Sequence, residues 1–259
     1  MHGPRWRVVL LAGPSGHRSA GDRCVAPKRR CAVNDQLTVE AVRRRIAEVR
    51  AEIAQLTDRS VRIVGVTKTH LDDVVVAALQ AGLVDLGENY AQDLRARAGA
   101  APILATGVAP RWHFIGQLQS NKVRLIAGDV WCWQTVDRSS IIAEIARRDP
   151  GARIMVQVDL AGIPGRGGCR IAEVSGLVGE AGRAGLAVIG LMAVGVPGPP
   201  ELSRTGFAQV VRTAEDLGLA ERSIGMSGDY RVAVEEGSTM VRLGSLLFGD
   251  RRVGGASSQ

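Results

Sequence analysis

The sequence predicts an α/β fold, a single (β/α)8 TIM barrel preceded by one helix. Eight apolar segments of strand length recur at nearly even spacing over about 215 residues, with helix-like segments between them. These apolar segments barely alternate with polar residues, which is typical of parallel strands buried on both faces. No Gly-x-Gly-x-x-Gly motif follows the first of them, which disfavours an open dinucleotide-binding sheet.

The regular pattern begins at Leu37, where a first helix is expected. Thr38 is a candidate N-cap, and the apolar residues after it recur at helical spacing. They are Val42, Ile46, Val49, Ile53 and Leu56. This helix should therefore pack one apolar face against the barrel.

The remaining elements follow in strand–helix order. Strands are expected at 62–67, 84–88, 111–115, 130–135, 153–158, 187–192, 223–226 and 240–244. Helices are expected over roughly 71–81, from 90 onward, and at 120–127, 139–148, 171–184, 203–217 and 230–236. The sequence shows no internal repeat.

The two ends of the chain do not fit this pattern. Residues 1–35 are predicted to be a disordered extension, 36–252 the barrel and 253–259 a flexible tail. The stretch from Gly13 imitates a phosphate loop, but Arg18 stands where the second glycine is required and no lysine follows. The apolar run before it is too short for a good signal peptide.

Charge is concentrated in the N-terminal stretch. The net charge is +7, and residues 1–35 contribute seven basic side chains against two aspartates. The remaining 224 residues therefore carry only +2. Nucleic-acid surfaces combine clustered basic charge with stacking aromatics, so no nucleic-acid partner is expected.

The cysteines and the hydropathy favour a cytoplasmic protein. Cys24, Cys31, Cys132 and Cys169 form no Cys-x-x-Cys pair and no metal-ligand spacing with histidine. Reduced thiols and no metal are the simplest expectation. No apolar run approaches the roughly 20 residues of a membrane span, so no membrane partner is expected either.

Lys68 is unusual because lysine is scarce in this chain. Only three of the 33 basic residues are lysines: Lys28, Lys68 and Lys122. A lysine kept at the end of an apolar strand suggests a need for an amine that can lose its proton, as Schiff-base chemistry requires. The alternative is a structural lysine whose charged end reaches solvent from the strand end.

Other polar residues stand at the expected strand ends, where barrel enzymes carry their chemistry. They are Glu88, Asn89, His113, Asp137, Asp159, Ser227, Arg242 and Ser245. Glycine and serine around Gly225–Asp229 and Gly237–Ser245 suit a phosphate site after the last two strands. Alternatively, Gly225 and Gly244 are small because helices cross the strands there.

Six segments resemble the pyridoxal-phosphate homeostasis protein family, in the family's order. They are Val66-Thr-Lys-Thr69, Gly87-Glu-Asn-Tyr90, Trp112-His-Phe-Ile-Gly-Gln-Leu-Gln-Ser-Asn-Lys122, Gly190-Leu-Met192, Gly225-Met-Ser227 and Gly237-Ser-Thr-Met-Val-Arg-Leu-Gly244. The resemblance covers residues 37–252. It implies a barrel of the alanine racemase N-terminal domain type without the racemase's second domain.

The resemblance also implies a set of residues that bind pyridoxal 5′-phosphate (PLP). Lys68 would hold PLP covalently as an aldimine, Ser227 and the amides of Gly244 and Ser245 would bind its phosphate, and Arg242 would face the pyridine nitrogen. Asn89 would lie beside the ring, with His113 nearby. Lys122 is expected to be structural.

Two residues and one longer stretch depart from the family's pattern. Ile224 and Gly228 differ from the usual residues of the seventh strand and its loop, without removing a phosphate donor. The stretch 159–169 has no lysine. The missing lysine puts a second PLP site in doubt.

An arginine at the pyridine nitrogen indicates restrained chemistry. Because arginine stays protonated, that nitrogen must accept a hydrogen bond and remain unprotonated, which makes a weaker electron sink. We therefore expect a protein that holds PLP as a Schiff base on Lys68 and acts in intracellular PLP (vitamin B6) homeostasis without strong catalytic turnover.

Two enzymatic alternatives remain. A PLP-dependent racemase or decarboxylase needs a base, and the chain has only Tyr90 and Tyr230 as tyrosines. A Schiff-base aldolase predicts its lysine on a later strand. The expected partners are PLP and possible PLP-dependent apoenzymes, with the chain a monomer or weak homodimer.

Overall fold

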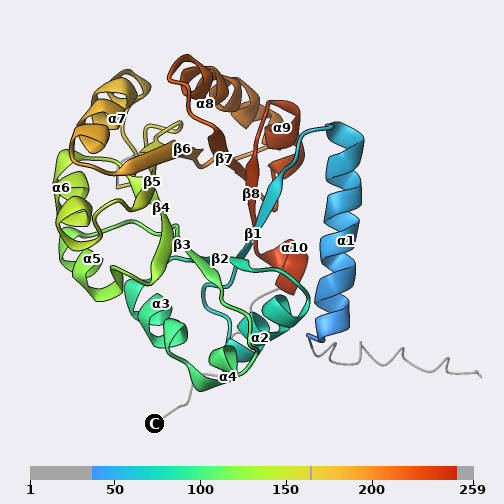
Figure 1. Ribbon diagram of the computed structural model, residues 1–259. Helices are drawn as coiled ribbons and strands as arrows, with labels where there is room; N and C mark the ends of the chain where they lie inside the picture. Colours follow the sequence, from blue (N-terminus) through green and yellow to red (C-terminus); the bar gives the residue numbers. More distant parts are fainter. Residues whose placement is uncertain (1–36, 164, 250–259) are drawn as a thin grey trace, which may run out of the picture. The chain divides into compact units, whose positions relative to one another are not determined.

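Eight parallel strands close into a barrel in the computed structural model, which describes residues 37–163 and 165–249. The strands follow one another in chain order, and the last returns to pair with the first (Figure 1). They are β1 Arg62–Val66, β2 Asp85–Glu88, β3 Arg111–Phe114, β4 Val130–Val136, β5 Arg153–Val158, β6 Ala187–Ala193, β7 Glu221–Met226 and β8 Met240–Leu243. The predicted (β/α)8 barrel is confirmed.

Helices surround the strands on the outside (Figure 1). They are α1 Val39–Leu56, α2 Asp72–Gln80, α3 Ala91–Ala98, α4 Ala101–Leu104, α5 Ser120–Ile126, α6 Ser139–Arg148, α7 Val174–Arg183, α8 Arg204–Asp216, α9 Tyr230–Glu235 and α10 Ser245–Phe248. Two 3-10 helices, η1 Ile171–Glu173 and η2 Pro200–Ser203, lead directly into α7 and α8.

Helix α1 starts where its sequence predicts. The Thr38 side chain accepts a hydrogen bond from the amide of Ala41 at 3.1 Å, an N-cap that stabilises a helix by about 1 kcal/mol. The apolar face of α1 is buried and packs beside α2, α9 and α10. Arg45 of α1 also donates to the carbonyl of Leu247 in α10 at 3.0 Å. The helix therefore covers the outside of the barrel where the first and last strands meet.

Two helices were not predicted, and both are short. Helices α4 and α10 each contain four residues, about one turn, so no helical periodicity can develop in their sequences. Elsewhere the expected and observed bounds differ mainly at the ends of elements. The expected helix 171–184 begins as the 3-10 helix η1 before it becomes α7.

Apolar side chains fill both the barrel and the layer between strands and helices. Two large clusters lie against the helices, and a smaller one contains Val64, Cys132, Met155, Met192 and Met240. This third cluster comes from strands β1, β4, β5, β6 and β8. Five different strands contribute to one cluster because their inward-facing side chains meet inside the barrel.

Cys132 and Cys169 are buried and form no disulfide. Burial raises the pKa of both thiols, to about 11 for Cys169. The thiols therefore stay protonated at neutral pH and are poor nucleophiles. The other two cysteines lie outside the described residues, as do the extension predicted at 1–35 and the tail predicted at 253–259.

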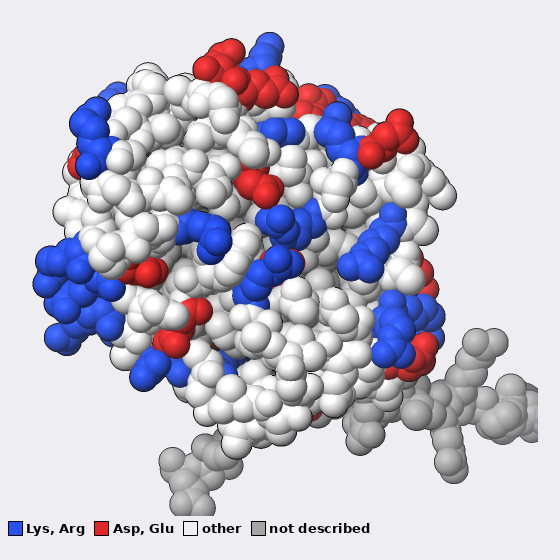
Figure 2. All heavy atoms as spheres, in the orientation of Figure 1, with Lys and Arg blue, Asp and Glu red and all other residues white. Residues whose placement is uncertain are grey.

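Charges of both signs are interspersed on the face drawn in Figure 2, with basic side chains near its centre. Among the described helices, none is long and apolar enough to cross a membrane.

Candidate functional site

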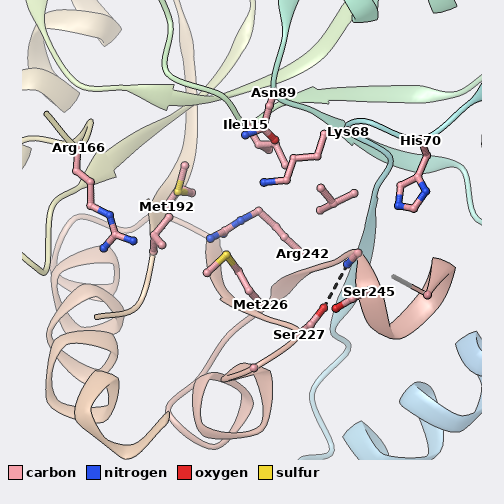
Figure 3. A pocket seen from close by; sticks show the side chains of 15 residues that line it. Lys68, His70, Asn89, Ile115, Arg166, Met192, Met226, Ser227, Arg242 and Ser245 are labelled. Carbon is pink, nitrogen blue, oxygen red and sulfur yellow. Dashed lines mark hydrogen bonds between the residues drawn. The ribbon is translucent and has the colours of Figure 1, made fainter. Parts of the chain in front are cut away.

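A pocket of about 790 Å³ is lined by residues at the carboxyl ends of the strands (Figure 3). Its lining includes six of the seven residues predicted to bind PLP: Lys68, Asn89, Ser227, Arg242, Gly244 and Ser245. They come from both the start and the end of the chain, and closure of the barrel between β1 and β8 brings them together. The volume is within the range of small-molecule sites.

Lys68 lies two residues beyond β1, in a turn. Its half-buried side chain extends into the pocket in Figure 3, on the side of Asn89 and facing Arg242. Thr69 follows with a φ of 64°, in the left-handed region that β-branched residues rarely occupy. Its hydroxyl donates to the carbonyl of Lys68 at 2.6 Å. A sharply turned backbone thus directs Lys68 into the pocket while Thr69 points to solvent.

Arg97 of α3 braces this turn from behind. Its guanidinium donates to the carbonyl of Thr67 at 3.2 Å, to the carbonyl of His70, to Asp72 at 3.2 Å and to the carboxylate of Glu88. The Thr67 hydroxyl donates to the same Glu88 oxygen. Residues on both sides of Lys68 are therefore tied to one arginine, and the turn is held from outside the pocket.

Glu88 is fully buried at the end of β2. Burial raises the pKa of Glu88, and the opposing attraction of Arg97 and hydrogen bond from Thr67 do not cancel this effect. Arg97 itself was not predicted as part of the site. Nothing in the helical sequence around it distinguishes Arg97 from an exposed arginine, because its partners lie outside α3, on β2 and in the Lys68 turn.

The opposite side of the pocket carries hydrogen-bond donors suited to a phosphate. The amide of Gly244 donates to the hydroxyl oxygen of Ser227 at 3.3 Å, and Ser245 follows in the same turn (Figure 3). Asp229 fixes the Ser227 loop by accepting a hydrogen bond from the amide of Met226 at 2.6 Å. Two hydroxyls and a backbone amide thus converge from the loops after β7 and β8.

The glycines of these loops have different roles. A Cβ atom on Gly225 would lie 2.6 Å from the Cβ of Ala233 in α9, and its φ is 95°. A Cβ on Gly244 would meet only Val66, at ordinary distances of 3.4 Å or more. The helix-crossing interpretation therefore applies to Gly225, whereas Gly244 is not required for packing.

Arg242 lies on β8, only 4% exposed, and lines the pocket between these two sides. It donates to the carbonyl and hydroxyl of Ser223 at 2.6 and 2.8 Å and to the carbonyl of Ala193 at 2.8 Å. Within the described residues no carboxylate forms an ion pair with it. Burial lowers the pKa of Arg242 to about 10, so it remains charged at neutral pH.

Asn89 presents a buried oxygen to this region. Its Oδ1 atom has no hydrogen-bond partner among the described residues, although it is shielded from solvent. Gly116 makes this position possible, because a Cβ there would lie 1.9 Å from the carbonyl oxygen of Asn89. A buried acceptor without a partner at a pocket wall is suited to a ligand that brings a donor.

His113 is the one predicted residue that does not line the pocket. It is fully buried in β3, where Nε2 lies 3.1 Å from Asp85 and Nδ1 lies 2.7 Å from Gln134. Burial lowers the pKa of His113 even though Asp85 opposes the shift. The imidazole is thus a neutral group of the barrel interior.

Two other strand-end carboxylates serve the loop after β5. Asp159 accepts hydrogen bonds from the amides of Ala161 and Gly162, and Asp137 accepts one from Gly168. Neither lines the pocket. The loop they hold carries Arg166, which was not predicted and which lies across the pocket from Lys68 in Figure 3.

Lys122, the other lysine in the described part of the chain, lies in α5 and away from the pocket lining. No group of three or more metal-ligating side chains occurs among residues 37–163 and 165–249.

Comparisons with known proteins agree with this geometry. Residues 37–252 match the family model for the alanine racemase N-terminal domain. A pyridoxal phosphate homeostasis protein of Deinococcus radiodurans is 34% identical over 215 residues, which cover 82% of this chain and 100% of the relative. The protein of the same name from Escherichia coli K12 is 32% identical, over 80% of this chain and 95% of the relative.

A solved structure carries the same fold. PipY of Synechococcus elongatus PCC7942, solved with PLP bound, superposes with a TM-score of 0.70 at 28% identity. The match covers 80% of this chain and 100% of PipY.

Proposed function

The chain belongs to the pyridoxal phosphate homeostasis protein family, and we propose that it binds PLP in the pocket at the carboxyl ends of its strands. PLP would supply an aldehyde, a group that combines reversibly with a primary amine. Lys68 is the lysine among the pocket-lining residues, so we assign this amine to Lys68. The observation that carries the proposal is the position of Lys68 opposite the Ser227, Gly244 and Ser245 donors.

The remaining lining residues fit the rest of the cofactor. Ser227, Ser245 and the amide of Gly244 offer donors to the phosphate, and the unpartnered Oδ1 atom of Asn89 offers an acceptor to a ring substituent. We assign Arg242 to the pyridine nitrogen. His113, which does not line the pocket, is given no direct contact with PLP.

Arg242 favours storage of the cofactor over turnover. Its guanidinium only donates hydrogen bonds, so a ring nitrogen beside it is an acceptor and stays unprotonated. Neither tyrosine supplies a base: Tyr90 is not among the lining residues, and the Tyr230 hydroxyl bonds to Glu52. We therefore propose a carrier that acts in intracellular PLP homeostasis, not a racemase, decarboxylase or aldolase.

The carrier role also suggests the location, the oligomeric state and the partners of the protein. We propose a cytoplasmic protein, a monomer or weak homodimer, that releases PLP to PLP-dependent apoenzymes. The names of the relatives support the homeostasis role. His113, Cys132 and Cys169 do not line the pocket, which supports Lys68 as its nucleophile.

A titration with PLP tests this function. The wild-type protein should develop a visible absorption band that saturates at one equivalent, and Lys68→Ala should not. Lys122→Ala is the matched control, because it removes an equal charge from a residue outside the pocket, and it should behave like the wild type. A wild-type protein that gains no band, or a band that survives in Lys68→Ala, would contradict the proposal.

A further inference from the structure

A row of hydrogen-bonded side chains runs through the barrel from Arg242 to Asp85. Arg242 donates to the Ser223 hydroxyl at 2.8 Å, and that hydroxyl donates to Oε1 of Gln134 at 2.7 Å. Nε2 of Gln134 lies 2.7 Å from Nδ1 of His113, whose Nε2 lies 3.1 Å from Asp85. All five residues are at most 5% exposed.

The row crosses the interior of the barrel. Gln134 is on β4 and Ser223 is on β7, and these strands are not neighbours in the sheet. A bond between their side chains therefore spans the inside. One end, Arg242, lines the PLP pocket, while the other, Asp85, is the first residue of β2 and lies at the opposite end of the barrel.

The chemistry of the two ends fixes the direction of every bond between them. Arginine only donates, so the Ser223 hydroxyl must accept from Arg242 and give its own proton to Gln134. The amide nitrogen of Gln134 then faces His113 and donates to Nδ1. An ionised carboxylate only accepts, so Nε2 of His113 carries the proton that is shared with Asp85. One tautomer of His113 satisfies both neighbours.

The charged groups around the far end favour this state. Burial alone would raise the pKa of Asp85, but hydrogen bonds from His113 and Arg111 hold it below the ordinary value. Arg111 donates to the second oxygen of Asp85 at 2.6 Å and stacks on Trp131, whose ring lies 5.0 Å from that of His113. Arg62, which also stacks on Trp131, disfavours a second proton on His113 and so keeps the imidazole neutral.

A row of this kind is costly inside a barrel unless every member is satisfied. Such interiors are usually filled by branched apolar side chains, and each buried polar group left without a partner destabilises the fold. All hydrogen bonds of the row form together only when the Ser223 hydroxyl points its proton at Gln134. In that orientation its oxygen accepts a hydrogen bond from one nitrogen of Arg242. Together with the carbonyls of Ser223 and Ala193, the row therefore holds the guanidinium of Arg242 through groups that do not line the pocket.

We propose that Ser223, Gln134 and His113 are positioning residues that fix the guanidinium of Arg242 for the cofactor, and that a ligand at Arg242 is sensed at His113. This inference rests on the proposed function, since it takes PLP as the ligand. It gives His113 a role through three hydrogen bonds in place of a direct contact.

The tautomer can be measured in cofactor-free protein by ¹⁵N NMR of the His113 side chain. At neutral pH the imidazole should be neutral, with its proton on Nε2 and none on Nδ1. An imidazolium, or a proton on Nδ1, would contradict the hydrogen-bond directions given above and would overturn the proposal. Addition of PLP should then shift the His113 signals, because bonds in a chain polarise one another.

Ser223→Ala interrupts the row, and Ser238→Ala is its matched control. Ser238 is also a fully buried serine near β8, but its hydroxyl donates only to backbone carbonyls. Ser223→Ala should weaken PLP binding by about tenfold, the effect of one hydrogen bond to a charged group, and should abolish the PLP-induced shift at His113. Ser238→Ala should keep both properties.

The possible outcomes separate this inference from the proposed function. If the wild type binds PLP at Lys68 and Ser223→Ala binds it equally tightly with the same shift at His113, the positioning role is wrong. If the wild type forms no Lys68 adduct at all, the proposed function and the inference fail together, and the adduct measurement identifies that case.

Discussion

Two buried arginines stand at the pocket, one behind the Lys68 turn and one in the lining, and their hydrogen-bonding groups are satisfied in different ways. Arg97, behind the Lys68 turn, is 6% exposed and forms ion pairs with Glu88 and Asp72. Arg242, at 4%, bonds to carbonyls and one hydroxyl, and no described carboxylate pairs with it. Arg97 is therefore neutralised by direct ion pairs, whereas Arg242 is attracted by Asp229 without an ion pair and directs its charge into the pocket.

This difference indicates that Arg97 holds the backbone of the site in place, whereas Arg242 binds the ligand. A charge that is neutralised by its own scaffold holds the backbone in place, as Arg97 does for the residues around Lys68. A desolvated charge held only by neutral groups attracts a ligand atom that accepts a hydrogen bond. We expect substitutions of the two arginines to affect different properties of the protein.

The largest effect should come from replacing each arginine by methionine. Arg97→Met leaves the buried Glu88 without its partner and should lower the free energy of unfolding by about 3–5 kcal/mol. Arg242→Met leaves only carbonyls and a hydroxyl unpaired and should cost about 1–3 kcal/mol. Urea denaturation measures both values.

PLP binding should show the opposite order. Arg242→Met should bind PLP at least tenfold more weakly than Arg97→Met under conditions where both are folded. Equal losses of stability in the two variants, or tighter binding by Arg242→Met, would remove the distinction between the two sides.

A smaller, pH-dependent effect should come from Glu88. Burial raises the pKa of Glu88 in the folded state, so its neutral form stabilises the fold. That contribution is complete below the unfolded-state pKa of about 4.3 and is lost as the pH rises through the folded-state value. Glu88→Gln, which is always neutral, should therefore gain stability relative to the wild type as the pH rises.

Denaturation of both proteins over a pH series gives this difference directly. A difference that stays constant, or one that reverses, would mean that Arg97 compensates the burial of Glu88 completely.

The smallest effect should be found at Thr69. Its φ of 64° strains a β-branched residue, and asparagine tolerates the left-handed region better. Thr69→Asn should therefore raise the free energy of unfolding by about 1 kcal/mol or less. Thr69→Val keeps the branched Cβ and serves as the control, and an equal gain in both variants would show that the backbone is not the cause.

The sequence predicts the fold well because each strand carries its own signal. Apolar runs such as 153–158 and 187–192 need no partner to be recognised, and the loops between them repeat at regular intervals. The pocket was predictable for the same reason. Lys68, Ser227 and Arg242 each stand at a strand end, and closure of the barrel brings strand ends together.

Contacts between distant strands were not predictable in this way. Gln134 and Ser223 are separated by 89 positions, and neither stands out in its own segment. Arg97 resembles a surface arginine until α3 is placed against the Lys68 turn. The family resemblance placed His113 near the cofactor, but its role depends on the buried side chains that it contacts, Asp85 and Gln134.

The most direct test of the account is the site of covalent attachment. PLP-loaded protein is reduced with borohydride, digested and mapped by mass spectrometry, which converts the reversible bond into a stable phosphopyridoxyl-lysine. The account predicts this group on Lys68 at close to one equivalent, with none on Lys122. An adduct spread over several amines, or located mainly on Lys122, would contradict it.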